Sequence, residues 1–181
     1  MLTGRVDIVG FGPGSKQKMT FEAYEAIENS DLIIGYGTYT GLIKEIFRDK
    51  DIKSSGMGEE TERCRMALDE ARKGKRVSLI CSGDSMLYGM AALVYELCPD
   101  EDVRINTIAG VTAALSCGAL LGAPLTDDFA TVSLSDHITP FEKTEKRLRC
   151  LARADMLIVL YNPASRQRPD HLKNAVNILL D

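Results

Sequence analysis

The strongest constraint on this chain is a repeated alternation of short apolar runs with segments of helical spacing. The candidate strands in the first part of the chain, each built around such apolar residues, are residues 6–9, 32–34, 76–81 and 103–108. The candidate helices that alternate with them are residues 21–28, 59–73, 90–97 and 113–120. Strands that alternate with helices pair in parallel and are covered by helices on both faces. The sequence therefore predicts an α/β fold with a parallel sheet in its first lobe.

Boundary signals support these helices. Thr20 stands directly before the first helix, where its hydroxyl can cap a free backbone N–H group. Gly74 follows the helix at 59–73, whose apolar residues repeat at i, i+3, i+4 and i+7.

A second α/β pattern follows a linker-like stretch at residues 122–129. Strands at 130–134 and 156–161 are accompanied there by helices at 142–154 and 171–180. We therefore predict two domains, residues 1–121 and residues 126–181.

Charge and cysteine spacing exclude several classes of protein. The net charge of −4 is unlike that of a typical nucleic-acid-binding protein, which presents a basic face. The five cysteines contain no CxxC pair and have only two histidines as companions, so we expect no zinc site and no disulfide framework. We interpret them as buried free thiols in a reducing cytoplasm. The sequence shows no signal peptide and no apolar run long enough for a membrane span, which favours a cytoplasmic protein without membrane contact.

The glycine-rich sequence VGFGPGS at residues 9–15 suggests a dinucleotide-binding loop but fails its two tests. Ser15 occupies the place of the last glycine of that fingerprint, and Pro13 removes a backbone donor that a phosphate would need. The second strand is followed by Gly35 and Tyr36 rather than by an acidic residue for a ribose. A dehydrogenase is thus disfavoured. Two interpretations stay open, a tight turn and the wall of a binding site.

Three loops of small and polar residues follow the strands at 6–9, 76–81 and 103–108. They contain the sequences GFGPGS, SGDSMLYG and AGVTAA. Ligands of parallel sheets bind beyond the carboxyl ends of the strands, where these loops should meet. Asp84 in the middle loop is either a helix cap or part of such a site. Together the loops favour a ligand-binding cleft.

Five motifs resemble those of the tetrapyrrole methylases. They are VGFGPG, SGDSMLYGM, AGVTAALSCGALLGAPL, SLSDHITPF and LYNPASRQR. The resemblance implies an S-adenosylmethionine-dependent enzyme with two α/β lobes and a cleft between them. The last two motifs are most similar to the subgroup that methylates precorrin-3B or cobalt-precorrin-3 at C17, with ring contraction, in cobalamin biosynthesis. Two alternatives stay open: a methylase that acts at another position, and a non-catalytic ligand-binding fragment.

The resemblance also implies a chain length, an assembly and a substrate. Family members continue beyond Asp181, so we expect the second lobe to be C-terminally truncated. They are commonly homodimers, and their substrate is a polycarboxylate tetrapyrrole.

The family's site residues transfer to this sequence motif by motif. The resemblance implies cofactor contacts at Pro13, Ser82, Gly83, Asp84, Leu87, Thr112, Ala113 and Asn162. Substrate contacts are expected at Gly12, Gly14 and Arg166, and no metal is expected. A negative charge at Asp84 would favour the sulfonium and ammonium groups of the cofactor. Asp84, Asp136 and His137 are candidates for a general base, although each is equally explained as a cap or loop residue.

Overall fold

The computed structural model describes residues 4–100, 102–137, 139–165 and 168–181. The chain divides into two compact units, Met1–Ser116 and Cys117–Asp181. The boundary between the units lies within helix α5 (Ala113–Leu120). The domain limits expected from the sequence, 1–121 and 126–181, stay a prediction.

The first unit is built on a five-stranded sheet with the strand order β3-β2-β4-β1-β5. Every neighbouring pair in this sheet is parallel, as the alternating sequence pattern predicts. The strands are β1 (Arg5–Gly10), β2 (Leu32–Tyr36), β3 (Ile52–Ser55), β4 (Arg76–Cys81) and β5 (Arg104–Ile108). The predicted α/β fold class is confirmed.

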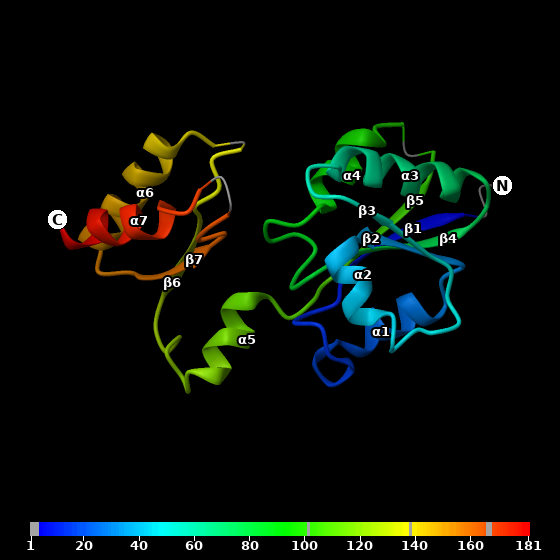
Figure 1. Ribbon diagram of the computed structural model, residues 1–181, viewed down its shortest axis with the longest axis horizontal. Helices are drawn as coiled ribbons and strands as arrows, with labels where there is room; N and C mark the ends of the chain where they lie inside the picture. The colour runs from blue at the N-terminus through cyan, green and yellow to red at the C-terminus, as the bar shows by residue number, and fades with distance from the viewer. Residues whose placement is uncertain (1–3, 101, 138, 166–167) are drawn as a thin grey trace. The chain divides into compact units, whose positions relative to one another are not determined.

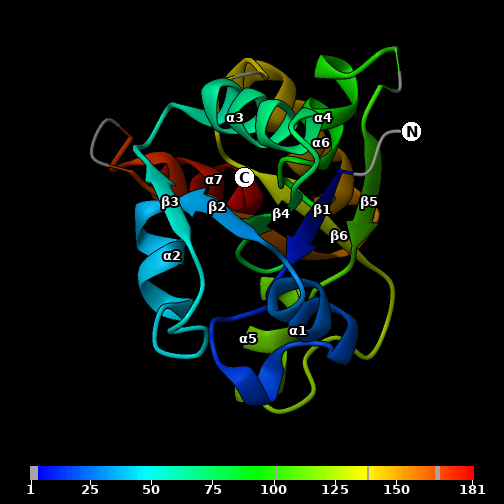
Figure 2. The same ribbon diagram turned by 90° about the vertical axis from the view of Figure 1, so that its right-hand side faces the viewer.

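Helices cover both faces of this sheet (Figure 2). The chain crosses the sheet in one direction from β1 to β3 and in the opposite direction from β3 to β5. Because such crossovers are right-handed, the two directions place their helices on opposite faces. One face carries α1 (Phe21–Glu28) and α2 (Gly37–Ile43), and the other carries α3 (Glu60–Arg72) and α4 (Ala91–Leu97).

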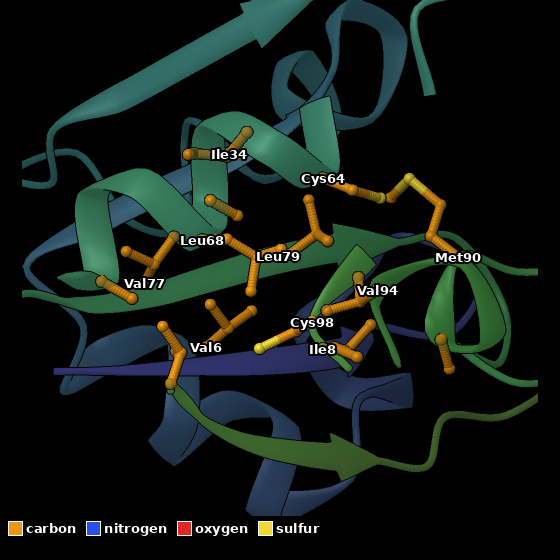
Figure 3. Close-up of a cluster of buried hydrophobic side chains, with 14 of the residues drawn as sticks. Val6, Ile8, Ile34, Cys64, Leu68, Val77, Leu79, Met90, Val94 and Cys98 are labelled. Atoms are coloured by element: carbon orange, nitrogen blue, oxygen red, sulfur yellow. The ribbon is translucent and has the colours of Figure 1, made fainter. Parts of the chain in front are cut away.

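Alternating side chains of the strands fill two separate cores. Val6 and Ile8 of β1 pack into the cluster beneath α3 and α4, which Figure 3 shows in close-up. Val9 belongs to the cluster on the α1 and α2 face. Successive residues of a strand point to opposite faces, so an apolar run without alternation is what a doubly covered strand requires.

Two elements of this unit do not appear among the sequence predictions, namely α2 and β3. The sequence of α2, GTYTGLI, contains two glycines, and that of β3, IKSS, is short and mostly polar. A strand at the edge of a sheet is only partly buried and needs no apolar run, so periodicity could not detect it. By contrast, the predicted cap of α1 is confirmed, since Thr20 Oγ1 accepts a hydrogen bond from the Ala23 N–H group at 3.1 Å.

The second unit contains one pair of parallel strands with helices packed on one face (Figure 1). Its elements are β6 (Phe129–Ser133), α6 (Phe141–Arg153), β7 (Leu157–Tyr161) and α7 (His171–Leu180). A small core joins them, centred on Val132, Leu134, Leu148 and Ala175. Both strands and both helices predicted for this part of the chain are therefore present.

The cysteines are free, but they are not all buried. Cys64, Cys81 and Cys98 lie in the core of the first unit, whereas Cys117 and Cys150 are exposed. The prediction of buried thiols is therefore wrong for Cys117 and Cys150, which lie on solvent-facing sides of α5 and α6. None of the helices described in the structure is both long and apolar enough to span a bilayer.

Candidate functional site

In the first sheet, a ligand is expected to bind at the carboxyl ends of β1 and β4. The two strands are neighbours, yet the chain leaves β1 toward α1 on one face and leaves β4 toward α4 on the other. Neighbouring strands whose connections diverge in this way leave a crevice beyond their ends. The loops after β1, β4 and β5 all lie at this edge.

The glycines of these loops are required because their backbones touch. Gly12 and Gly83 exchange two hydrogen bonds, of 3.0 and 2.9 Å between N and O. A β-carbon at Gly10 would lie 2.8 Å from both the Gly110 nitrogen and the Gly83 oxygen, and one at Gly110 would collide with the carbonyl oxygens of Gly83 and Gly10. The glycine-rich loop after β1 is thus joined to its two neighbours through main-chain atoms.

Asp84 connects two of the three loops. Its Oδ1 accepts hydrogen bonds from the Met86 and Leu87 N–H groups at 2.9 and 3.0 Å, and its Oδ2 accepts one from the Gly110 N–H group at 3.0 Å. Burial alone would raise the pKa of this carboxyl group, but the backbone N–H groups, that of Gly110 foremost, outweigh it and lower the pKa. Asp84 is therefore an ionised, half-buried carboxylate at the ligand edge.

The structure brings the other expected cofactor contacts of the first unit to the same edge. Ser82 is half-buried beside Gly83, and the Leu87 N–H group is bonded to Asp84. Backbone atoms of Thr112 and Ala113 both lie 3.7 Å from the position of a β-carbon on Gly83. The motif resemblance implies that these residues lie close together, and in the structure they do. Their roles in cofactor binding stay predictions.

The residues around Pro13 form the outer part of this edge. Pro13 is exposed between Gly12 and Gly14, both of which have positive φ angles, of 70° and 104°. A β-carbon on Gly14 would lie 3.3 Å from the Leu42 side chain of α2. Gly12 and Gly14 thus lie in the loop at the carboxyl end of β1, and their expected contact with the substrate stays a prediction.

Asn162 belongs to the second unit, directly after β7. It has a positive φ of 51°, which is uncommon outside glycine but tolerated by asparagine. Its Nδ2 donates a hydrogen bond to Ser133 Oγ at the end of β6, at 3.0 Å. The carboxyl ends of this strand pair are therefore connected by side chains.

A polar cluster beside Asn162 joins the base candidate Asp136 to His171, which sequence reasoning missed. Arg168 Nη1 donates hydrogen bonds to Ser135 Oγ at 2.8 Å and to Asp136 Oδ1 at 3.2 Å. The Nδ1 of His171 lies 2.8 Å from the Leu134 carbonyl oxygen, so Nδ1 carries the proton, and its Nε2 lies 3.8 Å from Asp136 Oδ2. His171 and Asp136 are far apart in the sequence and meet only because β6 and β7 pair. No local sequence motif indicates this contact.

The remaining candidates of this region differ in their surroundings. His137 is exposed and makes no hydrogen bond or ion pair with the rest of the described chain. The expected substrate contact Arg166 lies outside the described residues. Asp136 is thus the base candidate of the second unit that has ordered polar neighbours.

The described part of the chain contains no cluster of potential metal ligands, and burial keeps two of its thiols protonated. No group of three histidine, cysteine, aspartate or glutamate residues within it is arranged to hold a metal ion. Burial raises the pKa of the Cys64 thiol to about 12 and that of Cys81 to about 11, so both stay protonated at neutral pH.

The family comparison covers nearly the whole chain. Residues 5–181 match the family model described as Tetrapyrrole (Corrin/Porphyrin) Methylases. The chain belongs to the tetrapyrrole methylase family. The resemblance seen in the five motifs is thereby confirmed, and with it the assignment to S-adenosylmethionine-dependent methyltransferases.

Two relatives show how this tetrapyrrole methylase compares with curated proteins. It is 45% identical over 176 residues to a probable cobalt-factor III C(17)-methyltransferase of Salmonella typhimurium, covering 96% of this chain and 73% of the relative. It is 44% identical to a cobalt-factor III methyltransferase of Priestia megaterium, covering 99% of this chain but 34% of that longer protein.

Solved structures agree with the fold of this methylase. The methyltransferase CobJ superimposes with a TM-score of 0.89 at 33% identity, covering 98% of this chain and 75% of CobJ. A uroporphyrin-III C-methyltransferase from Thermus thermophilus, complexed with S-adenyl homocysteine, superimposes with a TM-score of 0.71 at 24% identity. The superposition covers 97% of this chain and 77% of the Thermus enzyme. The second similarity supports the fold alone.

Proposed function

We propose that this methylase transfers a methyl group from S-adenosylmethionine to C17 of precorrin-3B or of its cobalt-containing counterpart, with ring contraction, in cobalamin biosynthesis. The observation that carries the proposal is the 45% identity to a relative named for that reaction, over 96% of this chain. The similarity to the methyltransferase CobJ, at a TM-score of 0.89 and 33% identity, supports the methyl-transfer part of the proposal.

The ligand edge of the first unit fits this cofactor. Asp84 is ionised, and its Oδ2 accepts one hydrogen bond from the described residues, so acceptor capacity is left for a cationic group. Close backbone approach at Gly10, Gly83 and Gly110 leaves main-chain groups, rather than bulky side chains, along the crevice. We propose that Asp84, Gly83, Thr112 and Ala113 hold the cofactor, with Pro13, Ser82, Leu87 and Asn162 completing the contacts.

The residues of the chain act mainly by orientation. When bound, S-adenosylmethionine supplies an electrophilic methyl group on a positively charged sulfur. The glycine junction is rigid because its loops share backbone hydrogen bonds, so the groups it presents stay fixed in direction. Holding two reactants in line can contribute about 7–11 kcal/mol to lowering a barrier. A protein that works in this way needs no nucleophile and no metal of its own.

Ring contraction requires a proton acceptor, and the surroundings of Asp84 and Asp136 support a preference between these two candidates. The backbone N–H groups that lower the pKa of Asp84 also make it a weaker base than an ordinary aspartate. Asp136 is an exposed carboxylate, fixed by Arg168 and close to His171. We therefore favour Asp136 over Asp84 as the general base, and we place Gly12, Gly14 and Arg166 on the substrate side.

A product assay tests the reaction. The purified chain is incubated with precorrin-3B or cobalt-factor III and with S-adenosylmethionine carrying a ¹³C-labelled methyl group. We expect mass spectrometry to find a product heavier by one labelled methyl substitution, and NMR to place the label on C17. A label on another carbon would instead identify a methylase of different regiochemistry.

Cofactor binding is tested separately by calorimetry with S-adenosylmethionine. Because Asp84→Asn removes a charge-assisted interaction, it should weaken binding by about 10- to 150-fold, equivalent to about 1.5–3 kcal/mol. Asp49→Asn removes the same charge from an exposed position between α2 and β3 and should leave the affinity unchanged. Equal affinities of wild type and Asp84→Asn would show that Asp84 only connects the loops.

Assembly and location are further parts of the proposal. We propose a homodimer in the cytoplasm, without nucleic-acid or membrane contact, as the family resemblance implies. Analytical ultracentrifugation of the purified chain tests the first point, since a sedimenting species of monomer mass at micromolar concentration would contradict it.

A further inference from the structure

A row of aromatic side chains runs along the ligand edge on the side of β2 and β3, away from the glycine junction. The rings of Phe11 and Tyr39 meet edge to face with centroids 5.9 Å apart, and those of Tyr39 and Tyr36 do so at 5.2 Å. The guanidinium group of Arg63 continues the row, 5.9 Å from the centroid of the Tyr36 ring. We call Tyr36, Tyr39 and Arg63 the tyrosine edge.

Arg63 is a buried charge without a matching carboxylate. Its residue is 3% exposed, and no carboxylate of the described residues lies within ion-pair distance. Nε donates to Ser55 Oγ at 2.7 Å, Nη2 donates to the Gly56 carbonyl oxygen at 2.7 Å, and Nη1 donates to Met90 Sδ at 3.4 Å. These neutral acceptors give each of its three nitrogens one hydrogen-bond partner but leave its positive charge uncompensated. A buried charge without a counter-ion is costly to keep.

The two tyrosine side chains lie near this charge, since the Tyr36 ring contacts the guanidinium group and the Tyr39 ring packs against that of Tyr36. Both rings are half-buried, and neither hydroxyl makes a hydrogen bond within the part of the chain that the structure describes. Tyr36 ends β2 and Tyr39 lies in the first turn of α2, so both stand at the carboxyl edge of the sheet. Two free hydroxyl donors near an uncompensated cation suit an anion that accepts hydrogen bonds.

We propose that the tyrosine edge receives a carboxylate of the tetrapyrrole substrate, through the hydroxyls of Tyr36 and Tyr39. This inference rests on the proposed function, which makes the substrate a flat macrocycle with carboxylates at its rim. Arg63 acts as a positioning residue: its charge attracts the anion, and its hydrogen bonds hold the turn at Gly56 and the start of α4 at Met90. The cofactor also carries a carboxylate, so the experiment must separate the two ligands.

The test measures binding of uroporphyrin I, a porphyrin whose rim carries carboxylate side chains, by its fluorescence. Tyr36→Phe and Tyr39→Phe keep the rings and remove only the hydroxyls, so each should weaken uroporphyrin binding about 5- to 10-fold. Tyr95→Phe removes an exposed hydroxyl on α4, where it contacts Thr107, and should leave the affinity unchanged. Unchanged affinity in both Tyr36→Phe and Tyr39→Phe would overturn the proposal.

Arg63→Gln provides a readout that a purely structural role would not move. If its charge attracts the carboxylate, uroporphyrin affinity in this variant should fall and should depend less steeply on ionic strength than in the wild type. Circular dichroism establishes whether Arg63→Gln is folded. If it is not folded, the tyrosine variants alone test whether this edge binds a carboxylate.

Calorimetry with S-adenosylmethionine separates this inference from the proposed function. Intact cofactor binding together with weakened uroporphyrin binding in the tyrosine variants supports the substrate assignment. Loss of cofactor binding with unchanged uroporphyrin binding overturns it and assigns the tyrosine edge to the cofactor carboxylate. If the wild-type chain methylates no precorrin yet the tyrosine variants lose uroporphyrin affinity, the proposed function fails while the carboxylate site stands.

Discussion

The two units use the same parallel strand pairing but bury it to different extents. In the first unit, Val6 and Val9 of one strand point to opposite faces and are both fully buried. In the second, Val132 packs in the core with α6 and α7 and is buried, whereas Val159 on the opposite face of the strand pair is half-buried and joins none of the clusters found among the described residues. The strand sequences are similarly apolar, so the number of covering layers, rather than strand composition, sets the depth of burial.

The units also differ in how they connect their strand ends. Main-chain hydrogen bonds between Gly12 and Gly83 join the loops of the first unit. Side chains join those of the second, with Asn162 donating to Ser133 and Arg168 to Asp136. A main-chain junction depends on glycine, whereas a side-chain junction depends on particular donors and acceptors. Each kind of connection can therefore be broken by a different substitution.

Truncating one buried leucine in each unit should produce the largest effects. Leu79→Ala in β4 should lower the free energy of unfolding by about 4 kcal/mol, because its site is enclosed by a large core. Leu148→Ala in α6 should cost about 2 kcal/mol, because a small core can close around the cavity. Urea denaturation followed by circular dichroism measures both. Equal losses would contradict the comparison.

Hydrogen exchange should rank the units without any substitution. Amides of β1 and β4 are enclosed on both faces and should exchange about 100-fold more slowly than those of β6 and β7, a difference of about 2.7 kcal/mol in opening free energy. Mass spectrometry of peptides from the native protein provides the measurement. Equal protection of both sheets would show that the second unit is as tightly held as the first.

Gly110→Ala tests the main-chain junction. The new β-carbon would collide with the carbonyl oxygens of Gly83 and Gly10, so we expect a loss of about 2 kcal/mol in thermal unfolding and weaker cofactor binding. Gly41→Ala in α2 is the matched control, since nothing lies within 4 Å of its β-carbon. Alanine is the better helix former there, so the control should be slightly stabilised.

The smallest expected effect is a change in acid sensitivity of the first unit. Hydrogen bonds from Lys75, then Lys73 and Lys53, lower the pKa of Glu70 to about 2. Because the folded pKa is depressed from 4.5, this stabilisation is present above pH 4.5 and is lost as the pH falls toward 2. The melting temperature of Glu70→Gln should therefore depend less on pH in this window. An unchanged slope would show that the lysines do not stabilise the folded state through Glu70.

Sequence reasoning reached the parts of the fold that local patterns encode. The strand at residues 76–81 is mostly apolar, and the helix at Cys64 repeats its apolar positions at helical spacing, so both were predictable. The helix α2 and the strand β3 carry no such periodicity. They form because the rest of the sheet supplies the surface on which they pack.

The site was predictable only as a set of loops. Strand-end position and glycine content indicated that the loops at Gly12, Gly83 and Gly110 would meet, and they do. Which side chains face each other depends on the strand order, which no local motif reveals. Arg63 reaches Tyr36 across 27 residues, and His171 reaches Asp136 across 35, so neither pair has a sequence signature.

The glycine junction has a consequence for how such a methylase can change over evolution. Because Gly10 and Gly110 already touch their neighbours through their main chains, no side chain can be added at either position without forcing the loops apart, and Gly83 has a φ of 66° that other residues rarely adopt. Single substitutions are therefore hardly tolerated at these glycines. A change in the ligand that the junction recognises would require a different backbone conformation of the loops. At Tyr36 and Tyr39, by contrast, a single exchange alters the recognising group and leaves the scaffold intact. An engineer seeking new substrates would randomise the tyrosines and leave the glycines alone.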